Sequence, residues 1–186
     1  MTIDPNHTAI EFAVTYAMNS IIKGRFHEFS GTLLLDADNP SGSYVSVQID
    51  AGSLDSGSEQ RDEQLRSDAF FDIESHEALT FESTSVELAG DNHWQVHGNL
   101  SMLNVTRPVT LDTHYYGIVE DATSITRAGF VSETDIRRSD WGMDWNAEQD
   151  TGVLVSDRVR IALFVSAIPV DDESDDDEDD SEWAPR

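Results

Sequence analysis

The chain has 186 residues, a length that suits one domain with or without a tail. Eleven Lys and Arg residues against 37 Asp and Glu residues give a net charge of −26, which excludes a general nucleic-acid binder because such a protein needs a basic face. Cysteine is absent, so disulfides, thiolate metal sites and cysteine nucleophiles are excluded as well.

Apolar and polar residues alternate along most of the chain, which is the pattern of half-buried strands. The alternation is clear over 10–16, 29–35, 45–49, 94–102 and 159–165, and weaker over 79–88, 107–118 and 124–137. Turn-forming residues separate the segments, as at 38–42, 90–92 and 120–121. About eight strands joined by turns predict an all-β fold, either an antiparallel barrel or a sandwich.

One segment departs from the alternation. Ser56 and Glu59 have the spacing of a capping box, and residues 56–68 are predicted to form a short helix. Asp62 and Arg66, four residues apart, are expected to pair along one helix face. Because this helix is mostly polar, we expect it to lie across one end of the barrel rather than in the core.

The C-terminal end differs in composition from the rest of the chain. Residues 171–182 hold ten carboxylates and no basic residue. Like charges do not pack together, so residues 171–186 are expected to form a disordered acidic tail. Residues 1–170 then form the single folded domain.

That domain is itself strongly acidic. It holds 27 acidic against 10 basic residues, a net charge of −17, and Lys23 is the single Lys of the chain. Such a composition suggests a cytoplasm with molar salt, where a screening length of about 3 Å suppresses the repulsion between carboxylates. The alternative is an ordinary acidic protein.

The polar residues give no catalytic or metal-binding motif. His93 and His97 share one strand face, but four residues of strand separate them by about 13 Å, too far to chelate one ion alone. Neither a metal site, a cofactor nor an enzymatic activity is therefore expected. Five arginines lie beside predicted turns or in the predicted helix: Arg61, Arg66, Arg107, Arg137 and Arg138. They either pair with surface carboxylates or form a polar rim that binds a head group, and the residue pattern alone favours the surface pairs.

Several segments, taken in order, resemble the YceI-like family of polyisoprenoid-binding proteins. The opening 3–12 is similar to that of the family, 23–31 resembles its second strand, 59–72 its helical insert, 104–109 its GVTRPV turn, and 145–155 its last connection. Asn104 stands where Gly is usual in that turn. The resemblance covers residues 3–168, and its motifs are specific in combination rather than singly.

The resemblance implies a lipocalin-like, eight-stranded antiparallel β-barrel with a short helical insert, holding the tail of a long isoprenoid such as a quinone or polyprenyl lipid. It implies that Arg61, Arg66 and Arg107 bind the ligand at the mouth. Inward strand positions, with Trp145 as a tenth residue, are the candidates for the ligand-binding lumen: Phe12, Val14, Phe29, Leu33, Val47, Phe81, Val96, Leu100, Phe130 and Trp145. The alternative is that these side chains simply fill the barrel.

Three functions remain open at this point. The first is a binding protein that stores or carries an isoprenoid lipid, the second an enzyme acting on such a lipid, and the third an interaction scaffold that uses the acidic surface and tail. Nucleic acid is not expected as a partner, whereas transient membrane contact and a homodimer remain open. Members of the family are commonly exported, but the first residues show no basic or apolar leader, so we expect a cytoplasmic location.

The acidity generates a first prediction, that salt stabilises the fold. Lowering the salt from 1 M to 0.1 M lengthens the screening distance from about 3 Å to about 10 Å, so more of the carboxylates repel one another. We expect the melting midpoint to rise with KCl concentration in a thermal unfolding series. A midpoint that stays flat between 0.1 and 3 M KCl would contradict the interpretation of molar-salt adaptation.

Overall fold

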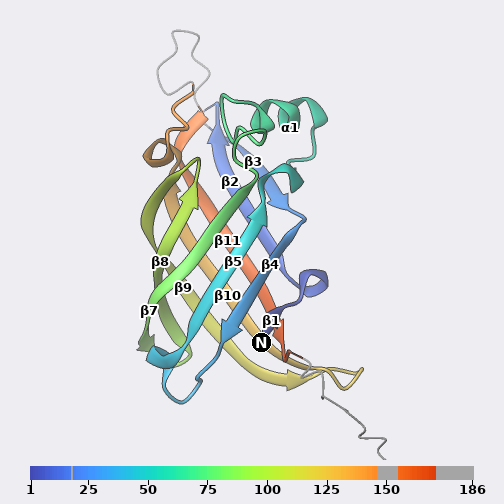
Figure 1. Cartoon of the computed structure of the whole chain (residues 1–186), viewed down its shortest axis with the longest axis vertical. Helices are drawn as coiled ribbons and strands as arrows, with labels where there is room; N and C mark the ends of the chain where they lie inside the picture. Colours follow the sequence, from blue (N-terminus) through green and yellow to red (C-terminus); the bar gives the residue numbers. More distant parts are fainter. Residues whose placement is uncertain (18, 146–154, 171–186) are drawn as a thin grey trace, which may run out of the picture.

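Antiparallel strands make up most of the described chain (Figure 1). The computed structural model describes residues 1–17, 19–145 and 155–170. The strands in these ranges are β1 (Thr2–Ile3), β2 (Ala9–Tyr16), β3 (Ser20–Phe26), β4 (Phe29–Leu34), β5 (Tyr44–Asp50), β6 (Leu54–Asp55), β7 (Ala78–Gly90), β8 (His93–Met102), β9 (Val105–Glu120), β10 (Thr126–Arg137) and β11 (Val155–Ile168). The helices are α1 (Glu59–Arg66) and the short 3-10 helices η1 (Pro5–His7), η2 (Pro40–Gly42), η3 (Ala51–Ser53) and η4 (Arg138–Trp141).

Eight of the strands close into a barrel. Hydrogen-bonded neighbours follow the order β4, β5, β7, β8, β9, β10, β11, and every pairing is antiparallel. The two-residue strand β1 joins the ends of this series, because Thr2 pairs with both Thr32 of β4 and Ile168 of β11. The expected eight-stranded antiparallel barrel with a short helical insert is confirmed, and the sandwich alternative is not observed.

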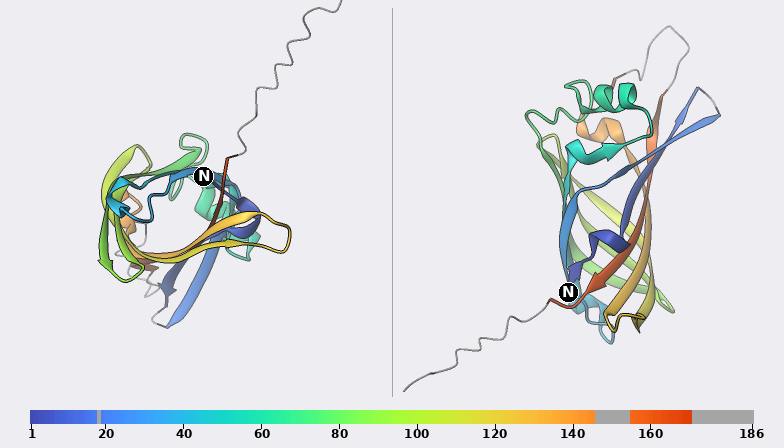
Figure 2. Two further views of the ribbon diagram at one scale, coloured as in Figure 1. Left: turned by 90° about the horizontal axis from the view of Figure 1, so that it is seen from below. Right: turned by 90° about the vertical axis from the view of Figure 1, so that its right-hand side faces the viewer.

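The β2–β3 hairpin continues the sheet from β11 and contributes to the wall before its tip projects outward (Figure 2). β2 pairs with β11, and β3 pairs on its other side only with the two-residue strand β6. Figure 2 shows the hairpin projecting outward near the end of the barrel that carries α1. The alternation pattern did not predict β1 or β6, since a two-residue strand is too short to show a period.

α1 lies across one end of the barrel (Figures 1 and 2), as its polar composition led us to expect. The predicted capping box is wrong, because the helix begins at Glu59 with Ser58 as its N-cap. Ser56 Oγ instead donates to Asp62 Oδ1 at 2.5 Å. The expected pairing of Asp62 with Arg66 is wrong too, because Arg66 donates to backbone oxygens of the segment before the helix. Among the described helices none has the length and apolar character to cross a membrane.

A two-residue turn connects β8 to β9. Leu103 and Asn104 both have left-handed backbone conformations, with φ angles of 53° and 58°. Two consecutive left-handed residues match the twist of a tight hairpin, and Asn tolerates this conformation better than other residues with a Cβ. Asn104 therefore suits a position where the YceI-like family usually has Gly.

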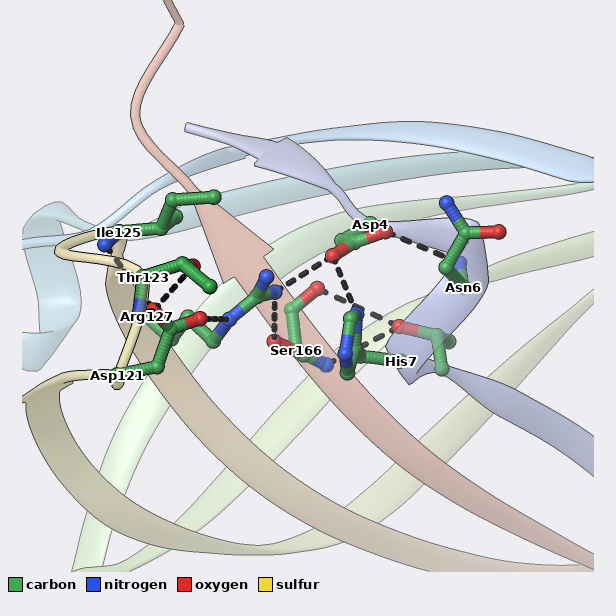
Figure 3. Close-up of polar contacts among 9 residues, drawn as sticks. Asp4, Asn6, His7, Asp121, Thr123, Ile125, Arg127 and Ser166 are labelled. Atoms are coloured by element: carbon green, nitrogen blue, oxygen red, sulfur yellow. Dashed lines mark hydrogen bonds and ion pairs between the residues drawn. The ribbon is translucent and has the colours of Figure 1, made fainter.

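A polar network (Figure 3) fixes the N-terminal segment to the barrel, at the end opposite α1 (Figure 1). Arg127 of β10 donates through Nη1 to Asp4 Oδ2 at 2.5 Å and through Nε to Asp121 Oδ2 at 2.6 Å. The backbone N–H of Asp4 also donates to the carbonyl oxygen of Ser166 in β11 at 2.8 Å. Asp4 and Arg127 are both largely buried, so this pair is poorly screened by solvent. The network stabilises the closure that β1 provides.

This network predicts a pH-dependent stability. The hydrogen bond from Arg127 holds the pKa of the Asp4 carboxyl below its usual value, against the opposing effect of burial. The ionised form therefore stabilises the fold above the ordinary Asp pKa, and this contribution is lost as the pH falls through the lowered value. We expect Asp4→Asn to reduce the free energy of unfolding by about 2 kcal/mol at pH 7, as measured by urea denaturation.

The matched control is Asp91→Asn, which removes the same charge from an exposed turn. The difference between wild type and Asp4→Asn should shrink as the pH is lowered below 4, because the wild-type carboxyl then becomes protonated too. Equal unfolding free energies for the two variants at pH 7 would show that the Asp4–Arg127 pair does not stabilise the closure.

Candidate functional site

An apolar cavity of about 250 Å³ occupies the interior of the barrel. Its lining comes from the barrel strands and from β2 and β3, because alternate side chains of a strand point to the same face. At the end that carries α1, the lining includes Leu65, Phe70 and Met143. At the opposite end it includes Ser43 and the partly exposed Tyr44. The cavity therefore extends along the barrel axis.

Eight of the ten lumen candidates line this cavity: Phe12, Val14, Leu33, Val47, Phe81, Val96, Leu100 and Phe130. The other two do not. Phe29 packs against the core without reaching the cavity. Trp145 is 37% exposed, and its ring centroid is 5.3 Å from that of Phe70, which lines the cavity where Trp145 does not. A role for Phe29 or Trp145 in lining the lumen is therefore not supported by their positions.

Two lining residues missing from the candidate set continue a predicted strand face. Trp94 and Met102 of β8 share the parity of Val96 and Leu100, and both are buried and line the cavity. The alternation of the sequence therefore already indicated that both side chains point into the barrel. The ring of Trp94 lies 5.0 Å from that of Tyr115, and Tyr115 lies 5.1 Å from Phe130. Burial in this aromatic cluster raises the pKa of Tyr115.

Two glycines leave room for aromatic rings of the cavity lining to pack directly against the backbone of the barrel wall. A Cβ atom on Gly24 would lie 2.3 Å from the Phe12 ring, and a Cβ atom on Gly98 would lie 2.4 Å from the Phe81 ring. Both distances are far inside van der Waals contact, so each ring occupies the space that a larger residue would take. Since Phe12 and Phe81 line the cavity, these two glycines help to set its width.

The polar groups of the lining are few, and the buried hydroxyls are paired. Thr113 Oγ1 and Ser132 Oγ lie 2.9 Å apart across β9 and β10. Ser43 Oγ donates to, and accepts from, the backbone of Asp36. Hydroxyls that bond to neighbours add little polarity to a cavity. The site therefore suits an apolar ligand along most of its length.

The three mouth candidates bond to the protein's own backbone. Arg61 donates to the carbonyl oxygen of Ser56 at 2.8 Å, and Arg66 to that of Leu54 at 2.8 Å. Arg107 Nε donates to a carbonyl oxygen of η4 at 3.0 Å. None of the three side chains is among the described residues that line the cavity. The bonds of Arg66 and Arg107 tie the insert and η4 to neighbouring strands, whereas that of Arg61 stays within the insert. A role of the three in head-group binding stays a prediction.

Arg138, in contrast, is buried and lines the cavity. It is the first residue of η4, which lies at the same end of the barrel as α1 (Figures 1 and 2). Its guanidinium donates to the backbone oxygens of Met143, Val155 and Ser156. Burial lowers the pKa of this group, although nearby Asp157 and Asp144 act in the opposite direction. The sequence placed Arg138 beside a turn, like the other candidate arginines. Its burial could not be predicted, because it depends on how η4 packs against the end of the barrel.

The histidines of the outer surface interact with neighbouring strands. The His93 ring stacks on His114 of β9 with centroids 4.9 Å apart and also contacts Asp112, whereas His97 bonds to Thr110. In the described ranges, no group of three or more His, Asp or Glu residues has the geometry to hold a metal ion.

Comparison with known proteins connects the barrel to one family. A UPF0312 protein of Shewanella denitrificans is 37% identical over 162 residues, which is 87% of this chain and 82% of the relative. A UPF0312 protein of Pectobacterium atrosepticum is 35% identical over 153 residues, covering 81% of this chain and 79% of the relative.

Solved structures show the same fold. The crystal structure of Burkholderia cenocepacia BcnA matches with a TM-score of 0.78 at 23% identity, covering 89% of this chain and 99% of that protein. A polyisoprenoid binding domain from Saccharophagus degradans, implicated in plant cell wall breakdown, matches with a TM-score of 0.64 at 15% identity, covering 90% and 98%. The model of the YceI-like domain matches residues 1–167, and the chain therefore belongs to the YceI-like family.

Proposed function

We propose that this protein binds one long-chain isoprenoid lipid, of the quinone or polyprenyl type, in the barrel interior and stores or transports it. The observation that carries the proposal is the apolar cavity along the barrel axis. The apolar lining selects for a hydrocarbon chain but does not by itself distinguish an isoprenoid from another chain. Support for the isoprenoid class comes from the similarity to the Saccharophagus polyisoprenoid binding domain.

The size of the cavity favours a slender ligand. Its volume of about 250 Å³ exceeds the ~150 Å³ of an apolar cavity that accommodates benzene, and lies just below the ~300–1,000 Å³ of typical ligand pockets. A single extended chain suits such a space better than a compact, bulky molecule does. A long polyprenyl chain would be enclosed only in part, unless the half-buried side chains of the lining move apart.

An enzymatic role has less support from the site. The lumen hydroxyls of Thr113 and Ser132 bond to each other, and neither has a histidine or carboxylate partner among the described contacts. A nucleophile in an enzyme is ordinarily held by a general base. The interaction scaffold is a separate alternative, and the ligand experiment below decides between it and lipid binding.

Lipid transfer tests the proposal directly. Delipidated protein is mixed with vesicles that contain a quinone or a polyprenyl lipid, separated from them, and extracted for mass spectrometry. We expect about one isoprenoid per chain, and we expect protein purified from its host to carry one as well. If neither preparation contains an isoprenoid, the binding proposal fails and the scaffold becomes the better interpretation.

The packing of Phe12 on Gly24 gives a second prediction. Gly24→Ala places a methyl group where the Phe12 ring now lies, so the ring must move farther into the cavity. We expect the affinity for an isoprenoid chain to fall about tenfold, because overpacking a filled site costs about 1–3 kcal/mol. Fluorescence titration or calorimetry with one chain length measures this change.

Gly129→Ala is the matched control. The nearest atom to a Cβ at this position is 3.6 Å away in Tyr116, an ordinary contact, so chain affinity should stay at the wild-type value. Circular dichroism verifies that both variants fold. Equal chain affinities for folded Gly24→Ala and wild type would show that the ligand does not occupy the space beside Phe12.

A further inference from the structure

Arg138 is the most unusual charged residue of the barrel. Its exposure is only 4%, and it lines a mostly apolar cavity in which Glu11 is the other charged residue among the described lining. In contrast, Arg127 and Arg158 each form an ion pair with at least one aspartate. For Arg138, no carboxylate oxygen of the described residues comes within 4.0 Å of the guanidinium. A chain with 37 acidic residues thus leaves this buried cation without an ion-pair partner in the described structure.

The hydrogen bonds of Arg138 orient its guanidinium without neutralising it. Nε donates to the carbonyl oxygen of Ser156 at 3.1 Å, Nη2 to that of Val155 at 3.2 Å, and Nη1 to that of Met143. A guanidinium has five N–H donors, so one N–H of each terminal nitrogen has no acceptor in these contacts. Three backbone bonds hold the side chain rigidly, which lowers the entropy that is lost when a ligand binds.

Asp157 and Asp144 lie near enough to favour the charged form, but in the described structure neither carboxylate contacts the guanidinium. A buried cation without a direct ion pair carries a large desolvation cost, so its position needs an explanation. The bonds to Val155 and Ser156 coincide with the irregular start of β11, where the register with β2 shifts. The hydrogen bonds of Arg138 therefore have a structural role, because they hold the start of β11 in place. A neutral donor would serve the same backbone oxygens at lower cost, so the charge itself points to an anion.

Building on the proposed function, we propose that Arg138 is the head-group site of this barrel and binds an anionic oxygen, of a phosphate or a carboxylate, at the end of the apolar chain. The head group then lies at the α1 end, and the chain extends toward Tyr44 at the other end. Leu65, Phe70 and Met143 line the cavity at the same end and make it apolar there. Low local polarity strengthens the pairing of opposite charges, so the site discriminates strongly between anionic and neutral head groups.

Two ligands with one chain test this assignment. Dissociation constants are measured for geranylgeranyl phosphate and for geranylgeraniol, which have the same chain and differ in charge. We expect the phosphate to bind to delipidated, full-length wild-type protein at least tenfold more tightly. Arg138→Gln keeps hydrogen-bond donors but removes the charge, so it should lose this preference while retaining the affinity for geranylgeraniol. Arg158→Gln, on the exposed outer face of β11, is the matched control and should keep the wild-type preference.

The outcomes separate the two proposals. If neither ligand binds to wild type, the proposed lipid-binding function fails, and the head-group assignment fails with it. If both bind equally well, or if folded Arg138→Gln keeps the preference for phosphate, the head-group assignment is wrong while lipid binding stands. A long-chain fatty acid that competes with the prenyl phosphate would show that the site recognises the anion rather than phosphate itself. A fatty acid that fails to compete would restrict the site to phosphate.

A measurement on wild type covers the case in which Arg138→Gln does not fold. The second pKa of a phosphate monoester is about 6 in water, and phosphorus NMR follows it in the bound ligand. Pairing with the guanidinium of Arg138 favours the dianion, so the bound phosphate should titrate below its value in water. A second pKa above the value in water would mean that the phosphate lies in the apolar cavity without a cation, and would overturn the assignment.

Discussion

Closure of the barrel depends on the N-terminal segment. A sheet of this size has two edges, and the barrel removes them only if the first and last strands are joined. The joining strand β1 has two residues, which pair with β4 on one side and β11 on the other. So short a ladder needs reinforcement, and the buried ion pair of Asp4 with Arg127 provides it. The apolar cavity remains shielded from water along this side of the wall because the segment stays in place.

Closure alone does not produce a cavity, since an eight-stranded barrel is just wide enough for side chains to fill it. Here the ring tips of Phe12 and Phe81 lie against Gly24 and Gly98, in the space that a larger residue would fill. Both rings line the cavity, and the residues at its two ends differ in chemistry. Aromatic packing around Trp94 lies toward one end, and the buried cation of Arg138 lies at the other. The two ends of the interior therefore differ in chemistry, one being aromatic and the other carrying a positive charge.

The fold was predictable because the pattern that determines it, alternation within each strand, is a local feature of the sequence. Period-two alternation predicts which side chains share a face, so eight of ten lumen candidates line the cavity. The errors occur where long-range contacts decide the outcome. The helix starts later than its capping box indicated because Ser56 bonds to Asp62. Trp145 does not reach the cavity because it packs on Phe70, which lines the cavity itself. Arg138 could not be distinguished from the other arginines, since its burial depends on how η4 enters the barrel.

The polarity of the interior bears on how a carrier could select its cargo. Each five-carbon unit removed from water contributes up to about 4 kcal/mol, at about 0.8 kcal/mol per carbon. An isoprenoid in a cell lies in a bilayer, however, so moving it into the barrel exchanges one apolar environment for another and this contribution nearly cancels. What remains is the shape of the cavity, the entropy lost by ordering the chain, and the contacts of the head group. Of these, the head-group contact is the one that changes most between ligands with the same chain. A buried guanidinium would therefore decide which lipid is held, while the apolar lining, being nearly neutral against the bilayer, would allow that lipid to be released again.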